Sequence, residues 1–134
     1  MRRSIPLFLV LALLAAGCDR ERDNEQARAL AARALQGVLA FPRSTLVSLS
    51  AGNDAAELSF SSPAVATDVA QWYRRALVAN SWELKTDQTG SDGSVSMYAV
   101  QGKRPLWLTF RPNVGGSGST YTLIGAIVVG DLIK

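Results

Sequence analysis

The spacing of hydrophobic and polar positions changes along the chain and predicts two helices. Between residues 27 and 40 apolar side chains recur every three or four positions, which is typical of an amphipathic helix. Phe41-Pro42 is expected to end this helix. A second helix is predicted after Ser62-Pro63, because serine suits an N-cap and proline suits the first helical position. Its inward stripe consists of Val65, Val69, Tyr73, Ala76 and Leu77.

Alternation of apolar and polar residues predicts strands on either side of the second helix. The predicted strands cover residues 45–50, 57–61, 82–86, 94–101, 105–111 and 120–129. This order favours a single α+β domain over residues 27–134, with a sheet-and-helix core at 43–134. We expect an antiparallel sheet of about five to six strands packed on one main helix and preceded by the N-terminal helix at 27–40.

A two-residue turn at Gly102-Lys103 would fix the register of the strands on either side of it. One face of this hairpin would then be apolar and belong to the core (Val95, Met97 and Ala99 with Leu106, Leu108 and Phe110). On the other face Tyr98 stands opposite Trp107.

An aromatic pair on the outer face of a sheet is expected to be covered, either by another part of the chain or by a partner. One explanation is that the helix at 27–40 lies over it; in that case the last strand, apolar on both faces, would be buried on both sides. The other explanation is a docking patch for a partner, formed by Tyr98, Trp107 and Arg111, because aromatic and arginine side chains dominate binding hot spots.

The N-terminus combines a short basic start with an apolar run from Ile5 to Ala16, as in a secretory signal. The run is too short to span a membrane, which needs roughly 20 apolar residues. Small residues and then a cysteine follow, in the order Leu14-Ala15-Ala16-Gly17-Cys18. This motif resembles the lipobox of bacterial lipoproteins, although Ala15 stands where leucine is more usual. The resemblance implies that residues 1–17 are removed and that Cys18 carries acyl chains.

The expected product is a protein held on a membrane surface by lipid, because two or three acyl chains bind firmly where one binds marginally. Residues 18–26 would be the lipidated cysteine and a charged tether. The resemblance places the protein on the periplasmic side of the bacterial envelope. Asp19 favours the inner membrane over the outer one by analogy with enterobacterial lipoproteins.

Composition excludes several classes of function. Of 14 basic residues, Arg2 and Arg3 belong to the signal, so 12 remain against 11 acidic residues, and a nearly neutral protein has no electrostatic footprint for nucleic acid. The chain has one cysteine and no histidine, so it lacks a disulfide pair, a thiolate metal cluster and the usual general base. Nothing predicts a cofactor, a metal site or catalytic residues, and we expect a protein that is not an enzyme.

From about Phe41 onward, the chain also resembles a group of small bacterial periplasmic lipoproteins. The resemblance rests on Phe41-Pro42, on the helix VAQWYRRAL at residues 69–77 and on Trp82 just beyond it. That group usually has a glycine before the tryptophan, where this chain has Ser81. The resemblance implies an α+β fold and assigns no activity or site residues.

These observations predict a lipid-anchored, non-enzymatic protein of the cell envelope that acts by binding. The first hypothesis is an accessory subunit of an envelope complex with a protein partner. The alternatives are an immunity-type inhibitor of a periplasmic enzyme and a carrier of a small apolar ligand held between helix and sheet.

Overall fold

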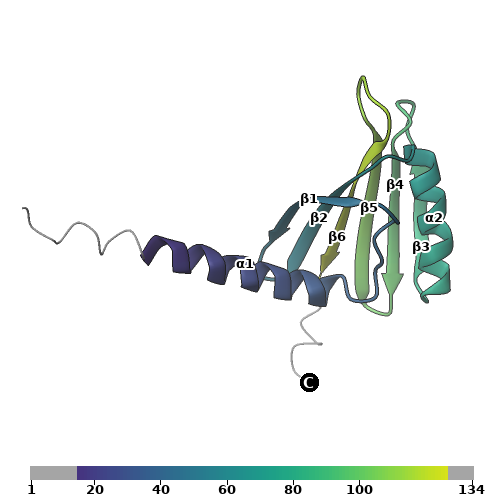
Figure 1. The fold of residues 1–134 in the computed structure, drawn as a ribbon. Helices are drawn as coiled ribbons and strands as arrows, with labels where there is room; N and C mark the ends of the chain where they lie inside the picture. The colour runs from purple at the N-terminus through teal and green to yellow at the C-terminus, as the bar shows by residue number, and fades with distance from the viewer. Residues whose placement is uncertain (1–14, 127–134) are drawn as a thin grey trace, which may run out of the picture.

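Six antiparallel strands form one sheet in the order β1-β2-β6-β5-β4-β3, as Figure 1 shows for the computed structural model, which describes residues 15–126. The α+β prediction is confirmed. Residues 1–14 of the predicted signal at 1–17 and the end of the predicted last strand, residues 127–129, lie outside the described residues. The elements are α1 (Ala15–Ala34), β1 (Thr45–Ala51), β2 (Ala55–Ser62), α2 (Ala66–Ala79), β3 (Glu83–Thr89), β4 (Val95–Gln101), β5 (Arg104–Pro112) and β6 (Ser119–Ala126).

The predicted hairpin register is confirmed. Gln101 pairs with Arg104 across the Gly102-Lys103 turn, and Tyr98 pairs with Trp107. The face that includes Val95, Leu106 and Phe110 is fully buried, and it continues through Tyr121 and Leu123 of β6.

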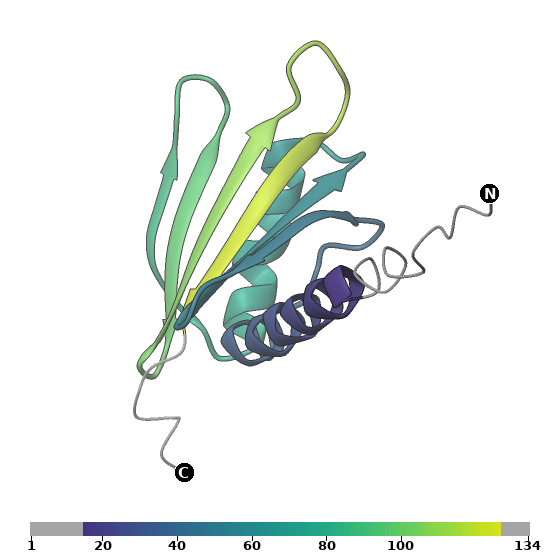
Figure 2. The same ribbon diagram turned by 90° about the vertical axis from the view of Figure 1, so that its left-hand side faces the viewer.

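Both helices cover this same face of the sheet (Figure 2). Six strands spaced about 4.8 Å apart form a sheet roughly 24 Å wide, which exceeds the width of one helix of about 10 Å. Helix α2 contacts β3, β4, β5 and β6, whereas α1 contacts β1, β2 and β6. The hypothesis that the N-terminal helix covers the outer aromatic pair is therefore wrong: α1 is needed to close the core over β1 and β2.

Helix α1 packs closely because β6 carries a glycine beneath it. The backbone of α1 reaches the sheet at Gly125, where an added Cβ would lie 2.6 Å from the Ala34 carbonyl oxygen. Ala31, Ala34 and Leu35 are buried in this contact. Small residues on both sides thus replace the side-chain layer that normally separates a helix from a sheet.

The first helix lies further toward the N-terminus than the expected range of 27–40. It begins at Ala15, so the segment expected to be a tether at 18–26 is helical, and it ends at Ala34 rather than at Phe41-Pro42. The cause of the early end is Gly37, whose φ of 79° is a left-handed conformation typical of a helix C-cap.

The second helix also starts later than expected. Ser62 ends β2 in the ladder with Ser119, and the N-cap of α2 is Val65, which makes no side-chain cap hydrogen bond. At the other end Ser81 has a φ of 66°. A glycine adopts this conformation without strain, whereas a serine does not.

Two buried tyrosines fasten the connection between α1 and β1 to the core. The Tyr73 hydroxyl donates to the Leu39 carbonyl oxygen at 2.8 Å. The Tyr121 hydroxyl accepts from the Phe41 amide at 3.1 Å and donates to Ser44 Oγ at 2.7 Å. Burial raises the pKa of Tyr73 far above its usual range, and the neighbouring Tyr121 adds to this shift.

Candidate functional site

The face of the sheet away from the helices carries the aromatic pair, and we call it the open face. Strand alternation places Tyr98 of β4, Trp107 of β5 and Ile124 of β6 in one row across it. The Tyr98 and Trp107 rings lie 5.4 Å apart between centroids, tilted by 31°. Trp107 is 43% exposed, which is unusual for so large an apolar side chain. Two of the three residues of the predicted docking patch, Tyr98 and Trp107, thus lie side by side on a face that neither helix covers.

Hydroxyl groups form the next row of the open face. This row runs through Ser96, Thr109, Thr122 and Ser59. The Ser59 and Thr122 hydroxyls are 3.1 Å apart and hydrogen-bonded to each other. The aromatic row is therefore bordered by neutral groups that can both donate and accept hydrogen bonds.

Arg111 stands apart from the aromatic pair. It lies on the same face of β5 as Trp107 but four residues away, which is about 13 Å along a strand. It lines a shallow depression of about 420 Å³ on the open face. The other lining residues are Glu57, Thr109, Thr120, Thr122 and Ile124. Arg111 and Glu57 give this depression one charge of each sign.

The contributions of Ile124, Thr122 and Glu57 to the open face were missed by sequence reasoning. Their alternation within β2 and β6 is visible in the sequence. The order of the strands in the sheet is not visible in the sequence, because the last strand, β6, lies between β2 and β5. A sequence search could have found these residues only by enumerating the strand orders that place the last strand centrally.

The space between α2 and the sheet is filled with side chains. Tyr73, Phe110 and Tyr121 are fully buried there, with ring centroids 5.4 to 5.9 Å apart. Close by, a cavity of about 10 Å³ borders Trp82. The Trp82 Nε1–H is buried without a hydrogen-bond partner in the described part of the chain. A cavity of this size holds about one water molecule and no larger ligand.

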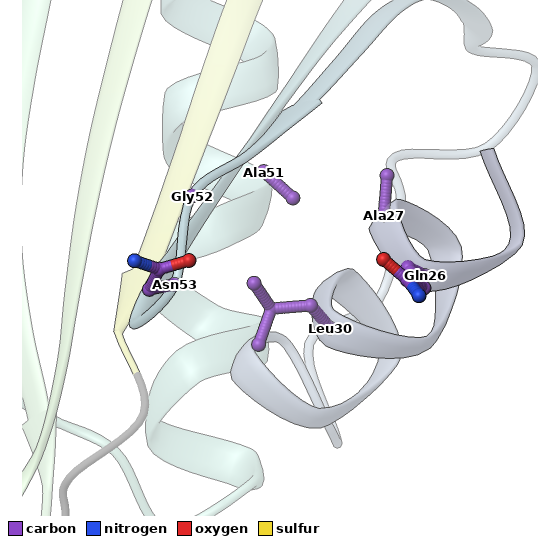
Figure 3. A pocket seen from close by; sticks show the side chains of 6 residues that line it. All are labelled: Gln26, Ala27, Leu30, Ala51, Gly52 and Asn53. Atoms are coloured by element: carbon purple, nitrogen blue, oxygen red, sulfur yellow. The ribbon is translucent and has the colours of Figure 1, made fainter. Parts of the chain in front are cut away.

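A larger cleft lies between α1 and the hairpin that joins β1 to β2. Its volume is about 440 Å³. Figure 3 shows Ala27 and Leu30 of α1 on one side and Ala51, Gly52 and Asn53 of the hairpin on the other. The lining combines the apolar side chains of Ala27, Leu30 and Ala51 with the amide groups of Gln26 and Asn53.

The described residues hold no cluster of side chains suited to binding a metal ion. Within residues 15–126 no three histidine, cysteine, aspartate or glutamate side chains gather as metal ligands. Hydrogen bonds from the Ser94 hydroxyl and amide lower the pKa of Asp92, which lies in an exposed turn, and the charge of Arg111 acts in the same direction. Among the same residues no helix is both long and apolar enough to cross a membrane.

Cys18 lies in the first turn of α1. Its acylation stays a prediction from the lipobox.

Comparison with known proteins assigns the domain to a family. A family model described as START domain-like matches residues 43–120, which is more than half of the chain. The chain therefore belongs to this START domain-like family. A search of curated proteins found no match, and a search of solved structures found none either.

Proposed function

We propose that the protein is a lipid-anchored, non-catalytic binding protein of the bacterial cell envelope, and that it holds an envelope protein partner on its open face. The observation that carries the proposal is the Tyr98–Trp107 pair, with Tyr98 half-buried and Trp107 exposed, in a face that neither helix covers. Aromatic side chains supply much of the binding energy of protein interfaces. The edges of such interfaces are usually polar, and the neighbouring row of hydroxyl groups fits this pattern. The START domain-like family favours ligand binding over catalysis.

Anchoring is the part of the proposal supported by the sequence motif. Acylation of Cys18 would hold the domain at the periplasmic surface of a membrane, preferably the inner one. The test is the substitution Cys18→Ser, followed by cell fractionation and intact mass measurement. We expect the acyl mass to disappear and processing by lipoprotein signal peptidase to stop. A variant that remains membrane-bound and is still cut before residue 18 would disprove the anchor.

The open face is tested by a pull-down from detergent-solubilised native membranes. The variant Tyr98→Ala/Trp107→Ala removes both rings of the pair, and circular dichroism checks its folding. Leu39→Ala/Val114→Ala is the matched control, because these two side chains are apolar and exposed but lie outside the open face. Loss of a stoichiometric partner from the first variant alone supports the proposal. A partner kept by both variants places the binding surface elsewhere.

If the captured partner is a soluble enzyme that loses activity on binding, the protein is an inhibitor rather than an accessory subunit.

A carrier of a small apolar ligand is the second candidate, favoured by the START domain-like match and by the 440 Å³ cleft. Leu30→Trp would fill part of the cleft from its α1 side. Native mass spectrometry of protein purified from membranes should then show a bound lipid-sized mass with the wild type and less of it with the variant. Absence of any added mass in the wild type would count against a carrier.

A further inference from the structure

The two edges of the sheet differ in how well they are protected against pairing with another strand. Edge strand β3 carries charged side chains at Glu83, Lys85 and Asp87, which discourage such pairing. The opposite edge, β1, has the sequence TLVSLSA and no charge. Two of its apolar side chains face solvent: Leu46 is 50% exposed and Val47 is 62% exposed. Within residues 15–126, β1 is therefore the edge strand that lacks charged side chains.

Helix α1 extends past this edge, as Figure 1 shows. Of the six residues that line the cleft, three belong to α1 and three to the end of β1 and the turn that follows it. Ala27 and Leu30 line the cleft from α1, and Ala51 lines it from the end of β1. A residue in a packed sheet occupies roughly 160 Å³, given a strand spacing of about 4.8 Å, a layer of about 10 Å and a rise of about 3.3 Å. The 440 Å³ cleft therefore has room for about three residues of an added strand.

The exposed leucine and the open cleft lie at opposite ends of the same strand. Leu46 is near the start of β1, and it pairs with Phe60 on the helix side of the sheet. Ala51 is at the end of β1 and pairs with Ala56 on that same side. When two antiparallel copies of β1 pair about a twofold axis, the start of each strand meets the end of the other. Each copy then offers the apolar side chain that the other cleft accepts.

We propose that β1 pairs with β1 of a second copy of this chain, with Leu46 of each copy seated over Ala27 and Leu30 of the other. Val47 is the extra residue of a β-bulge, because the register shifts between Leu46 and Ser48. If Val47 is left out of the count, pairing Leu46 with Ala51 of the second copy places Leu49 on the twofold axis. Side chains that pair across the two strands then lie on the same face of the sheet. The axis is perpendicular to the sheet, so two six-stranded sheets become one and both open faces point the same way.

A seven-residue strand pair is short, and the association is expected to be weak in dilute solution and populated where molecules are concentrated. The pairing does not depend on the open face. It uses the same cleft as the carrier candidate, so a bound lipid and a second copy would exclude each other.

Cross-linking of the full chain in whole cells tests the pairing. Ser50→Cys places a thiol on the exposed side of β1, close to its copy across the axis, and a short bis-maleimide should join two chains. Thr86→Cys is the matched control, with an exposed thiol on the opposite edge strand. The unsubstituted chain is the second control, because its only cysteine is Cys18. Cross-linking of that chain would show a free Cys18 thiol and contradict the anchor without bearing on β1.

We expect a cross-linked dimer from Ser50→Cys and none from Thr86→Cys. Adding Val47→Lys to Ser50→Cys should abolish the dimer, because a lysine on an edge strand opposes pairing. Adding Val78→Lys should leave it intact, since that valine is 66% exposed on α2, away from the edge. Equal cross-linking from both cysteine positions, or none from Ser50→Cys while a monofunctional maleimide labels it, would overturn the proposal.

Discussion

Gly125→Ala tests the placement of α1 on the core face, on which the openness of the aromatic face depends. The added Cβ would lie 2.6 Å from the Ala34 carbonyl oxygen and 2.7 Å from Leu35 Cδ2. A flexible side chain could move aside, but the carbonyl belongs to the helix backbone, so α1 itself must shift. Overpacking of this kind costs about 1–3 kcal/mol.

The upper bound for this substitution is the complete release of α1. Release would expose Leu35 and the methyl groups of Ala31 and Ala34, which are buried in the structure. A leucine contributes about 1.5–3 kcal/mol and a methyl group about 0.8 kcal/mol, giving a total of about 3–5 kcal/mol. We therefore expect the free energy of unfolding to fall by about 1–5 kcal/mol. An unobstructed glycine-to-alanine change in a strand would instead raise it by about 0.5–1 kcal/mol, so the two outcomes differ in sign.

Urea unfolding followed by tryptophan fluorescence and circular dichroism measures this change. Gly116→Ala is the control, because no atom lies within 4 Å of its added Cβ and we expect a change of at most about 0.5 kcal/mol. Adding Leu35→Ala to Gly125→Ala should not restore stability, since the carbonyl contact remains. If Gly125→Ala is as stable as Gly116→Ala, α1 does not pack at this site and the reasoning about the open face fails.

Three further outcomes are expected. Ser81→Gly should raise the free energy of unfolding by about 1 kcal/mol or less, seen as a higher melting temperature, because glycine relieves the positive φ after α2. Arg104→Ala should lower it by about 1–2 kcal/mol in urea unfolding, since Nη2 donates to the Gln36 carbonyl at 2.9 Å and the guanidinium lies 5.2 Å from the Trp82 ring centroid. Tyr73 has a raised folded-state pKa, so its contribution to stability is complete below about pH 10, the unfolded value, and decreases above it. Absorbance titration at alkaline pH should show this tyrosine ionising only with unfolding, and ionisation in the folded protein near pH 10 would contradict its burial.

The hairpin of β4 and β5 could be predicted residue by residue because its information is local. A two-residue turn at Gly102-Lys103 leaves one register, and strand alternation then assigns each side chain to a face. The pairing of Tyr98 with Trp107 follows directly. This local rule gave the central feature of the candidate site without any knowledge of the other four strands.

The position of the first helix could not be predicted from its apolar stripe. The stripe indicates that one side of the helix is buried. It does not indicate which face of the sheet the helix packs against. That choice depends on the number of strands on the core side and on Gly125, which lies about 90 residues away in sequence. The apolar residues of β6 are consistent with either face, and only the strand order distinguishes the two placements of the helix.

Helix ends depend on single residues whose conformation the pattern does not specify. Gly37 ends α1 before the proline, and Ser62 remains in β2 instead of capping α2. The left-handed backbone of Gly37 decides the first boundary, and the strand pairing of Ser62 with Ser119 decides the second. The residue type alone permits either outcome.

The helical conformation of residues 15–34 changes how the domain would sit relative to an anchor at Cys18. A flexible tether of nine residues has a root-mean-square span of roughly 15–18 Å in every direction, so the domain could tumble freely at the membrane. The helical segment from Cys18 to Ala34 is instead a rod of about 24 Å, and its end is fixed to the core at Gly125. A lipid attached to such a rod would restrict both the height and the tilt of the sheet. The open face would then stay within a narrow range of distances from the membrane. It would meet a partner at that distance with a nearly constant orientation.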